Sequence, residues 1–143
     1  MALDLPEDEY FAALQRQFER TPALNFIKQR LEALSPGRAR VVLEPSDSYL
    51  NGGGVIHGGI VATVLDSVGW FACATQSGGY WLFTAEFKIN FLDVATETVI
   101  ATGEVLRKGS DLFHARMDAR TAGDRHVATA LGTFMVIPRT FRL

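Results

Sequence analysis

The sequence predicts an α+β protein in which an antiparallel sheet wraps around one long buried helix. The first observation is the stretch 58–75, whose residues suit a helix and place apolar side chains on every side of it. A helix without a polar face is normally buried by the rest of its domain. The second observation is that four strand-like runs follow this stretch, separated by glycine-containing turns. Together they indicate a sheet that covers the helix.

Two helices are predicted before the sheet. Pro6 followed by three acidic residues is typical of a helix start, because acids stabilise the first turn, and this helix is expected to end near Thr21. Apolar residues from Leu24 onward indicate a second helix that runs to Leu34. Residues 1–34 are therefore expected to form a helical extension, which either packs on the domain or covers the mouth of a pocket.

The remaining elements follow from turn residues and from alternation. A strand is expected over 38–44 and a loop over 45–50. After the long helix, turns at 77–79, 108–110 and 122–124 separate further strands. These strands are expected over 80–91, 97–107, 111–121 and 126–137. The run 111–121 alternates apolar and polar side chains, so one face of the sheet is covered and the other is wet.

Composition narrows the class of protein. With 143 residues, 48% hydrophobic and 21% charged, the chain is long enough for one globular domain with a core. Its net charge of −2 gives no basic surface for nucleic acid. The acidic N-terminus lacks a signal pattern, and the longest apolar run contains a carboxylate, so no membrane partner is expected. One cysteine, Cys73, fits a reducing cytoplasm, where we expect the protein to reside.

Asp66 is the carboxylate inside the apolar helix. A buried, ionised carboxylate is unstable unless something pairs with it or it serves a purpose, and desolvation raises its pKa. Its neighbours on the helix include Ala62, Thr63 and Gly69, which leave room beside it. Two interpretations stay open: a structural carboxylate bonded to a strand edge or facing a wet interface, and a catalytic group.

The start of this helix supplies hydrogen-bond donors. Gly58 and Gly59 leave the first backbone N–H groups uncovered, and such groups can bind an anion or a developing oxyanion. His57 stands at the cap position, and Asn51 adds a nearby carboxamide. The glycines alone would equally indicate a tight turn. Donors and a carboxylate together favour acyl chemistry.

Several other kinds of site are not indicated. Ser67 has no G-x-S-x-G motif around it, and the glycines form neither a P-loop nor G-x-G-x-x-G. His57, His114 and His126 are too far apart to suggest a metal site, so no metal or cofactor is expected. For His57 we weigh a structural hydrogen bond that fixes the glycine loop against a role in acid–base catalysis.

The glycine-rich segment and the helix after it carry a recognisable motif. It reads Asn51-x-x-Gly54-x-x-His57-Gly58-Gly59, followed by Ala62-Thr63-x-Leu65-Asp66-Ser67. This motif resembles the signature of the hotdog-fold acyl-CoA thioesterases, specifically the PaaI-like and THEM2-like branch. A weaker resemblance extends from about Ser35 to Phe134 and leaves out the N-terminal quarter.

The resemblance implies a hotdog fold and hydrolysis of an acyl-CoA thioester to a free acid and CoA. Asp66 would be the general base that activates water, or the nucleophile. The Gly58 amide would stabilise the oxyanion and Asn51 would orient the carbonyl. By alignment to the family, Thr84 would position the attacking water.

Contacts with the rest of the substrate are less well indicated. Gly59 is expected to touch the substrate, and Arg107 and Lys108 either bind the CoA phosphates or form a solvated hairpin end. The family often has Arg-Pro where this chain has Asp93 and Val94. The alternatives to a thioesterase are a non-catalytic acyl-CoA sensor and a hotdog hydratase or dehydratase.

Geometry predicts an assembly. Gly58 and Asp66 are eight residues apart, so an α-helix separates them by roughly 12 Å. An oxyanion donor and a base must act on the same carbonyl within hydrogen-bond reach, the base through at most one water. We therefore expect a homodimer, or a dimer of dimers, in which the helix start of one subunit faces Asp66 of the other. The sequence leaves the acyl group open.

Overall fold

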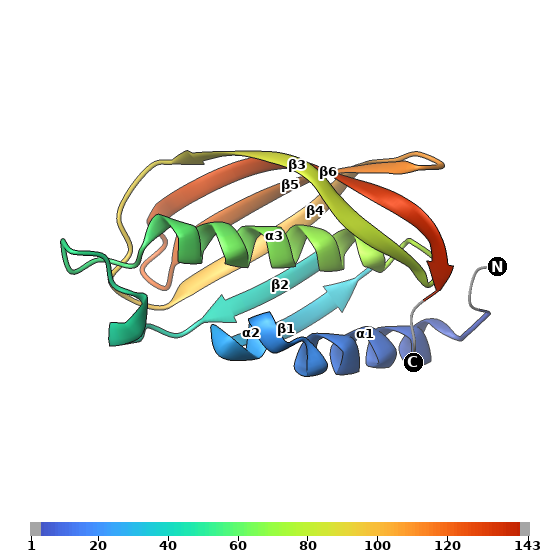
Figure 1. Cartoon of the computed structure of the whole chain (residues 1–143), viewed down its shortest axis with the longest axis horizontal. Helices are drawn as coiled ribbons and strands as arrows, with labels where there is room; N and C mark the ends of the chain where they lie inside the picture. The colour runs from blue at the N-terminus through green and yellow to red at the C-terminus, as the bar shows by residue number, and fades with distance from the viewer. Residues whose placement is uncertain (1–3, 141–143) are drawn as a thin grey trace.

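A computed structural model describes residues 4–140, which form one six-stranded antiparallel sheet curved around a long helix (Figure 1). The elements in chain order are α1 (Glu7–Arg20), α2 (Pro22–Phe26), β1 (Gln29–Ser35), β2 (Arg38–Leu43), a 3₁₀ turn η1 (Asp47–Tyr49), α3 (Gly58–Ala74), β3 (Tyr80–Phe91), β4 (Val99–Lys108), β5 (Leu112–Thr121) and β6 (His126–Thr140). The strand order is β1-β2-β4-β5-β6-β3, so β1 and β3 are the edges. The predicted α+β architecture is confirmed.

One side of α3 packs tightly on the sheet. Val64, Leu65 and Val68 are fully buried there. A Cβ atom on Gly103 of β4 would lie 2.5 Å from the Val68 carbonyl oxygen, and one on Gly69 would lie 2.7 Å from the Phe134 ring. Only residues without a side chain allow so close an approach. These contacts fix the depth of α3 against the sheet.

The other side of α3 is covered only in part, where the edge strand β3 contacts Asp66 and Trp70. Ala62, Thr63, Asp66 and Trp70 are half-buried, and they follow one another along this side of the helix. The expectation of a fully buried helix therefore holds only for the side that faces the sheet. Although α3 is apolar, no helix within residues 4–140 combines the length and hydropathy needed to cross a lipid bilayer.

The N-terminal segment is partly different from the prediction. α1 ends at Arg20 as expected, but α2 stops at Phe26 and β1 follows it, so the expectation of a helix through Leu34 is wrong. Lys28 has a φ of +55°, which ends the helical path, and Gly37, with a φ of +73°, turns the chain so that β1 pairs with β2. The helical extension is thus shorter than 1–34.

α1 lies against the C-terminal half of α3. Leu14 and Phe18 are buried in the contact, and the rings of Phe18 and Phe71 have centroids 5.1 Å apart. The Tyr10 hydroxyl donates a hydrogen bond of 2.5 Å to the carbonyl of Ala74, at the last turn of α3. Packing on the domain, which is one of the two predicted roles for the extension, is therefore observed.

A β-bulge interrupts β3 next to α3. The register with β6 shifts between Thr84 and Glu86, which leaves Ala85 as an extra residue. Strict alternation would place Thr84 and Phe87 on opposite faces of the sheet. Because of the bulge, both lie on the core side of the sheet: Thr84 bonds to Asp66 of α3, and Phe87 packs against the core. The bulge therefore aims Thr84 at α3 without turning the rest of β3 over.

Candidate active site

Asp66 and Thr84 meet across the interface between α3 and β3. The Thr84 hydroxyl donates a hydrogen bond of 2.6 Å to Oδ1 of Asp66. Burial raises the pKa of the Asp66 carboxyl, and the hydrogen bond from Thr84 opposes this rise by stabilising the charged form. Oδ2 makes no hydrogen bond to any residue in the range 4–140. One carboxylate oxygen is thus held, and the other can take a proton or attack.

An apolar cavity of about 250 Å³ lies beside this carboxylate. From α3 and β3 it is lined by Thr63, Asp66, Ser67, Trp70, Phe71 and Trp81. The two tryptophan rings meet edge to face with centroids 5.2 Å apart. Trp70 is held in place because its indole N–H donates to the Leu82 carbonyl at 2.8 Å. The aromatic walls exclude water from one side of the carboxylate, which explains the raised pKa of Asp66.

The start of α3 leaves one backbone donor free. His57 is the N-cap, and its Nδ1 accepts a hydrogen bond of 2.8 Å from the Gly59 N–H. The N–H groups of Ile60 and Val61 both point to the His57 carbonyl. The Gly58 N–H therefore has no partner among the described residues, whereas the Gly59 N–H is already used. This bond agrees with the structural interpretation of His57, and a role in acid–base catalysis stays a prediction.

Asn51 is oriented by the turn that precedes the helix. Its Oδ1 accepts hydrogen bonds from the N–H groups of Gly53, at 2.8 Å, and Val55, at 3.4 Å. Gly54, with a φ of +78°, closes this turn. Because the oxygen is occupied, the Nδ2 group of the carboxamide is the free end and can only donate. Asn51 therefore presents a second donor near the Gly58 N–H.

A second, smaller hollow of about 170 Å³ contains these donors. It is lined by Asn51, Gly58 and Val61 on the helix side and by Phe91, Asp93 and Val94 on the other. The Phe91 ring lies over Gly58, since a Cβ atom there would be 3.3 Å from it. The hollow therefore offers two hydrogen-bond donors beside an exposed aromatic ring.

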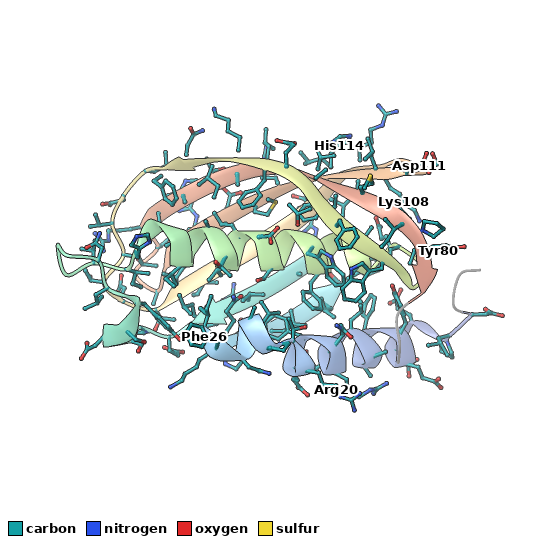
Figure 2. All side chains as sticks on the ribbon, in the orientation of Figure 1. Arg20, Phe26, Tyr80, Lys108, Asp111 and His114 are labelled. Carbon is teal, nitrogen blue, oxygen red and sulfur yellow. The ribbon has the colours of Figure 1, made fainter. Side chains whose placement is uncertain are left out.

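The two hollows are separate within one chain. They share no lining residue, and the unbroken α3 keeps Gly58 roughly 12 Å from Asp66 along its axis. Arg107 and Lys108 line neither hollow. Lys108 lies near the β4–β5 hairpin, at the end of the molecule away from the start of α3, with its Nζ 5.9 Å from the Phe113 ring centroid (Figure 2). Their contact with CoA phosphates stays a prediction.

Some lining residues were not identified from the sequence. The cavity beside Asp66 is lined in part by residues from the N-terminal helices, and its aromatic wall includes Trp81. No local pattern marks these residues, because only the folded chain brings them to α3. Ser67 and Phe71 could have been found, since both lie within five residues of Asp66 on the same helix.

Comparisons with known proteins give matches to one family. The family model of the thioesterase superfamily matches residues 53–128, a segment that includes Gly58, Asp66 and Thr84 but not Asn51. Human acyl-coenzyme A thioesterase 13 is 26% identical over 105 residues, which are 72% of each chain. A thioesterase family protein from Silicibacter pomeroyi has a similar structure, with a TM-score of 0.84 and 31% identity. The match covers 90% of this chain and 98% of that protein. The PaaI protein of E. coli shares the fold, with a TM-score of 0.88 and 20% identity. The match covers 95% of this chain and 99% of that protein.

Proposed function

Because this chain belongs to the thioesterase superfamily and is a hotdog-fold thioester hydrolase of the PaaI and THEM2 type, we propose that it hydrolyses an acyl-CoA thioester to a free acid and CoA. The observation that carries the proposal is the Asp66 carboxylate, which is held by Thr84 at one oxygen and faces an apolar cavity. The human relative, an acyl-coenzyme A thioesterase by name, supports the choice of an acyl-CoA.

Asp66 acts on the thioester in one of two ways. As a general base, it removes a proton from water, whose oxygen attacks the carbonyl carbon; the C–S bond then breaks and CoA leaves as the thiolate, which takes up the proton. As a nucleophile, it forms a mixed anhydride with release of CoA thiolate, and water then hydrolyses the anhydride. Both routes require ionised Asp66, and both products are the same acid and thiol.

The donors at the start of α3 stabilise the charge that develops on the carbonyl oxygen. In this proposal the Gly58 N–H and the Asn51 Nδ2 group bind the oxyanion, with the dipole of α3 behind the amide. His57 contributes by holding the loop, since its Nδ1 accepts a hydrogen bond from the Gly59 N–H. Thr84 orients Asp66 and the attacking water.

A two-fold homodimer would bring the two hollows together. β3 is an edge strand, it carries Thr84, and it ends at Phe91, whose ring covers Gly58. Antiparallel pairing of two β3 edges, centred between Phe87 and Lys88, would place Thr84 and Asp66 of one copy against Phe91 and Gly58 of the other. Phe91 and the following Leu92, which are 55% and 53% exposed, would be covered by this pairing. The proposed sites are therefore composite.

The rival activities lack support at this site. A hydratase of this fold class would combine a histidine with an acid, but among residues 4–140 no histidine lines either hollow of the proposed composite site. A sensor without catalytic function would not need a carboxylate with one free oxygen in an apolar setting, where ionisation is unfavourable.

The direct test follows free thiol release from a panel of acyl-CoA thioesters. We expect the wild type to hydrolyse some of them and Asp66→Asn to lose about 10²–10⁴-fold in kcat, the range typical of a lost general base. Asp111→Asn is the matched control, because that surface carboxylate lines neither hollow. Hydrolysis by Asp66→Asn at nearly the wild-type rate would reject the assignment.

A further inference from the structure

One wall of the cavity beside Asp66 is formed by the N-terminal helices. This wall is formed by Gln17 of α1, by Thr21 between the helices, and by Ala23 and Leu24 of α2. All of them precede residues 53–128, the part of the chain that matches the family model. The wall that faces the catalytic carboxylate is thus supplied by the N-terminal extension.

The wall is fixed at several points. α1 is tied to α3 through the Tyr10 hydroxyl and through the contact between the Phe18 and Phe71 rings. Beyond α2, the carbonyl of Ile27 accepts a hydrogen bond from the buried Tyr49 hydroxyl. A wall that is anchored on both sides of the cavity limits the space behind Asp66 instead of adapting to whatever enters it.

Gln17 is the polar side chain of this wall with free hydrogen-bonding capacity. Its carboxamide makes no hydrogen bond to any residue between 4 and 140, whereas the Thr21 hydroxyl donates to the Gln17 carbonyl at 2.7 Å. The opposite side of the cavity is formed mainly by Trp70, Phe71 and Trp81. An acyl chain that follows the aromatic side away from Asp66 would reach this wall.

The volume of the cavity limits the length of the acyl chain that fits inside it. A cavity of about 150 Å³ in a protein interior holds one benzene molecule, which has six carbon atoms. By the same scale, the cavity of about 250 Å³ holds roughly ten carbon atoms. A long-chain fatty acyl group would therefore have to leave the cavity or displace the N-terminal helices.

On the basis of the proposed acyl-CoA hydrolysis, we infer that α1 and α2 set the length of the acyl group and that Gln17 is a specificity-determining residue. The substrates carry compact acyl groups of up to roughly ten carbon atoms. Straight chains and ring-bearing groups of this size both fit the cavity by volume.

Gln17→Phe tests the inference, because the larger ring shortens the cavity. We expect the ratio of kcat/KM for decanoyl-CoA to that for butanoyl-CoA to fall at least about tenfold, since each poorly fitted methylene changes kcat/KM by about 10-fold or more. Gln15→Phe is the matched control: it lies on α1 but outside the cavity, with its side chain bonded to Glu19. That variant should keep the wild-type ratio within about twofold.

Gln17→Ala tests the opposite direction and keeps the inference falsifiable if the phenylalanine variant does not fold. The smaller side chain should raise the ratio of dodecanoyl-CoA to octanoyl-CoA hydrolysis at least about threefold relative to wild type, and Gln15→Ala should not. An unchanged length profile in a folded Gln17 variant that still hydrolyses acyl-CoA would overturn the inference while leaving the proposed function intact. Efficient hydrolysis of hexadecanoyl-CoA by the wild type would also overturn it.

A binding measurement separates the inference about acyl length from the proposed acyl-CoA hydrolysis. Both tryptophans of the chain line the cavity, so their fluorescence reports on its occupant. With Asp66→Asn, which binds without turnover, octanoyl-CoA should change this fluorescence strongly and hexadecanoyl-CoA weakly. If the wild type hydrolyses no acyl-CoA, the proposed function fails, and this length dependence alone decides whether the cavity selects by size. Equal responses to both would overturn the inference.

Discussion

The two hollows along α3 differ in what each can supply to a reaction. The hollow at the helix start offers the Gly58 N–H and the Asn51 carboxamide, and the carboxylate near it, Asp93, is paired with Arg125 at 3.7 Å. The cavity at the middle of the helix offers the Asp66 carboxylate between aromatic walls. One hollow can stabilise negative charge, and the other can act as base or nucleophile.

The difference follows from helix geometry. Free backbone N–H groups occur only in the first turn, because every later N–H bonds to a carbonyl four residues before it. In the middle of a helix only side chains can do chemistry. A site that needs both backbone donors and a desolvated carboxylate cannot take them from neighbouring positions of one helix, which is why a second copy is required in our proposal.

The largest expected effect tests whether the two hollows belong to one site. Asn51→Ala and Asp66→Asn should each be nearly inactive, but a mixture refolded together should recover about a quarter of the wild-type activity. About half of randomly paired dimers are mixed, and each of these has one intact site and one doubly damaged site. Thiol release after co-refolding measures the recovery. No recovery in verified mixed dimers would place the site within one chain.

The next effect isolates the backbone donor. Gly58→Pro removes the N–H, and proline is tolerated at the first position of a helix. We expect kcat to fall about 10²–10³-fold relative to Gly58→Ala, the loss typical of an oxyanion donor. The alanine variant is the control, because it adds the same Cβ atom under Phe91 but keeps the N–H. Equal activity of the two variants would show that this amide does not take part.

A smaller effect tests how Thr84 influences the pKa of Asp66. Burial raises the pKa of Asp66, and the Thr84 hydrogen bond lowers it, so Thr84→Val should raise it further. Because ionised Asp66 is required, the acidic limb of the kcat/KM profile should move to higher pH, which a pH series with one good substrate measures. Thr129→Val, which lines neither hollow, is the control. A limb that stays in place or moves to lower pH would contradict the assigned coupling.

The smallest effect concerns stability. The pKa of Asp66 is raised in the folded state, so the folded protein holds this proton more tightly than the unfolded chain does. The free energy of unfolding therefore falls as the pH rises above the ordinary pKa of aspartate. Asp66→Asn should therefore have a Tm about 2–4 °C above wild type at neutral pH. The difference should vanish at acidic pH, below the ordinary pKa of aspartate. Thermal unfolding across pH measures it, and a lower Tm for the variant at neutral pH would contradict it.

Much of the fold was predictable, because its signals are local. The apolar run of α3, the alternation of β5 and the glycine turns each report on their own neighbourhood. The helix expected through Leu34 was wrong for a physical reason: Leu24, Ile27 and Leu31 have helical spacing, but Gln29 and Leu31 also alternate with exposed residues as in a strand. The pairing of β1 with β2 decided between the two, and no local pattern records it.

Some residues of the candidate site could be predicted from the sequence, and others could not. His57 was placed as a cap and Asp66 as the unusual carboxylate from their positions in the sequence alone. Thr84 came from the family resemblance, because no spacing rule joins residues eighteen positions apart on a helix and a strand. The wall formed by Gln17 and Leu24 could not be predicted, since it depends on how α1 and α2 lie against α3.

The glycine at position 103 also bears on how this protein can change over evolutionary time. It meets the Val68 carbonyl on the side of α3 that faces away from the Asp66 cavity. The backbone that holds the carboxylate in place is thus supported from behind, by residues that line neither hollow along α3. Mutations can accumulate among the cavity residues and explore new acyl groups while this support stays constant. A substitution at Gly103 would instead push α3 outward and affect every substrate alike.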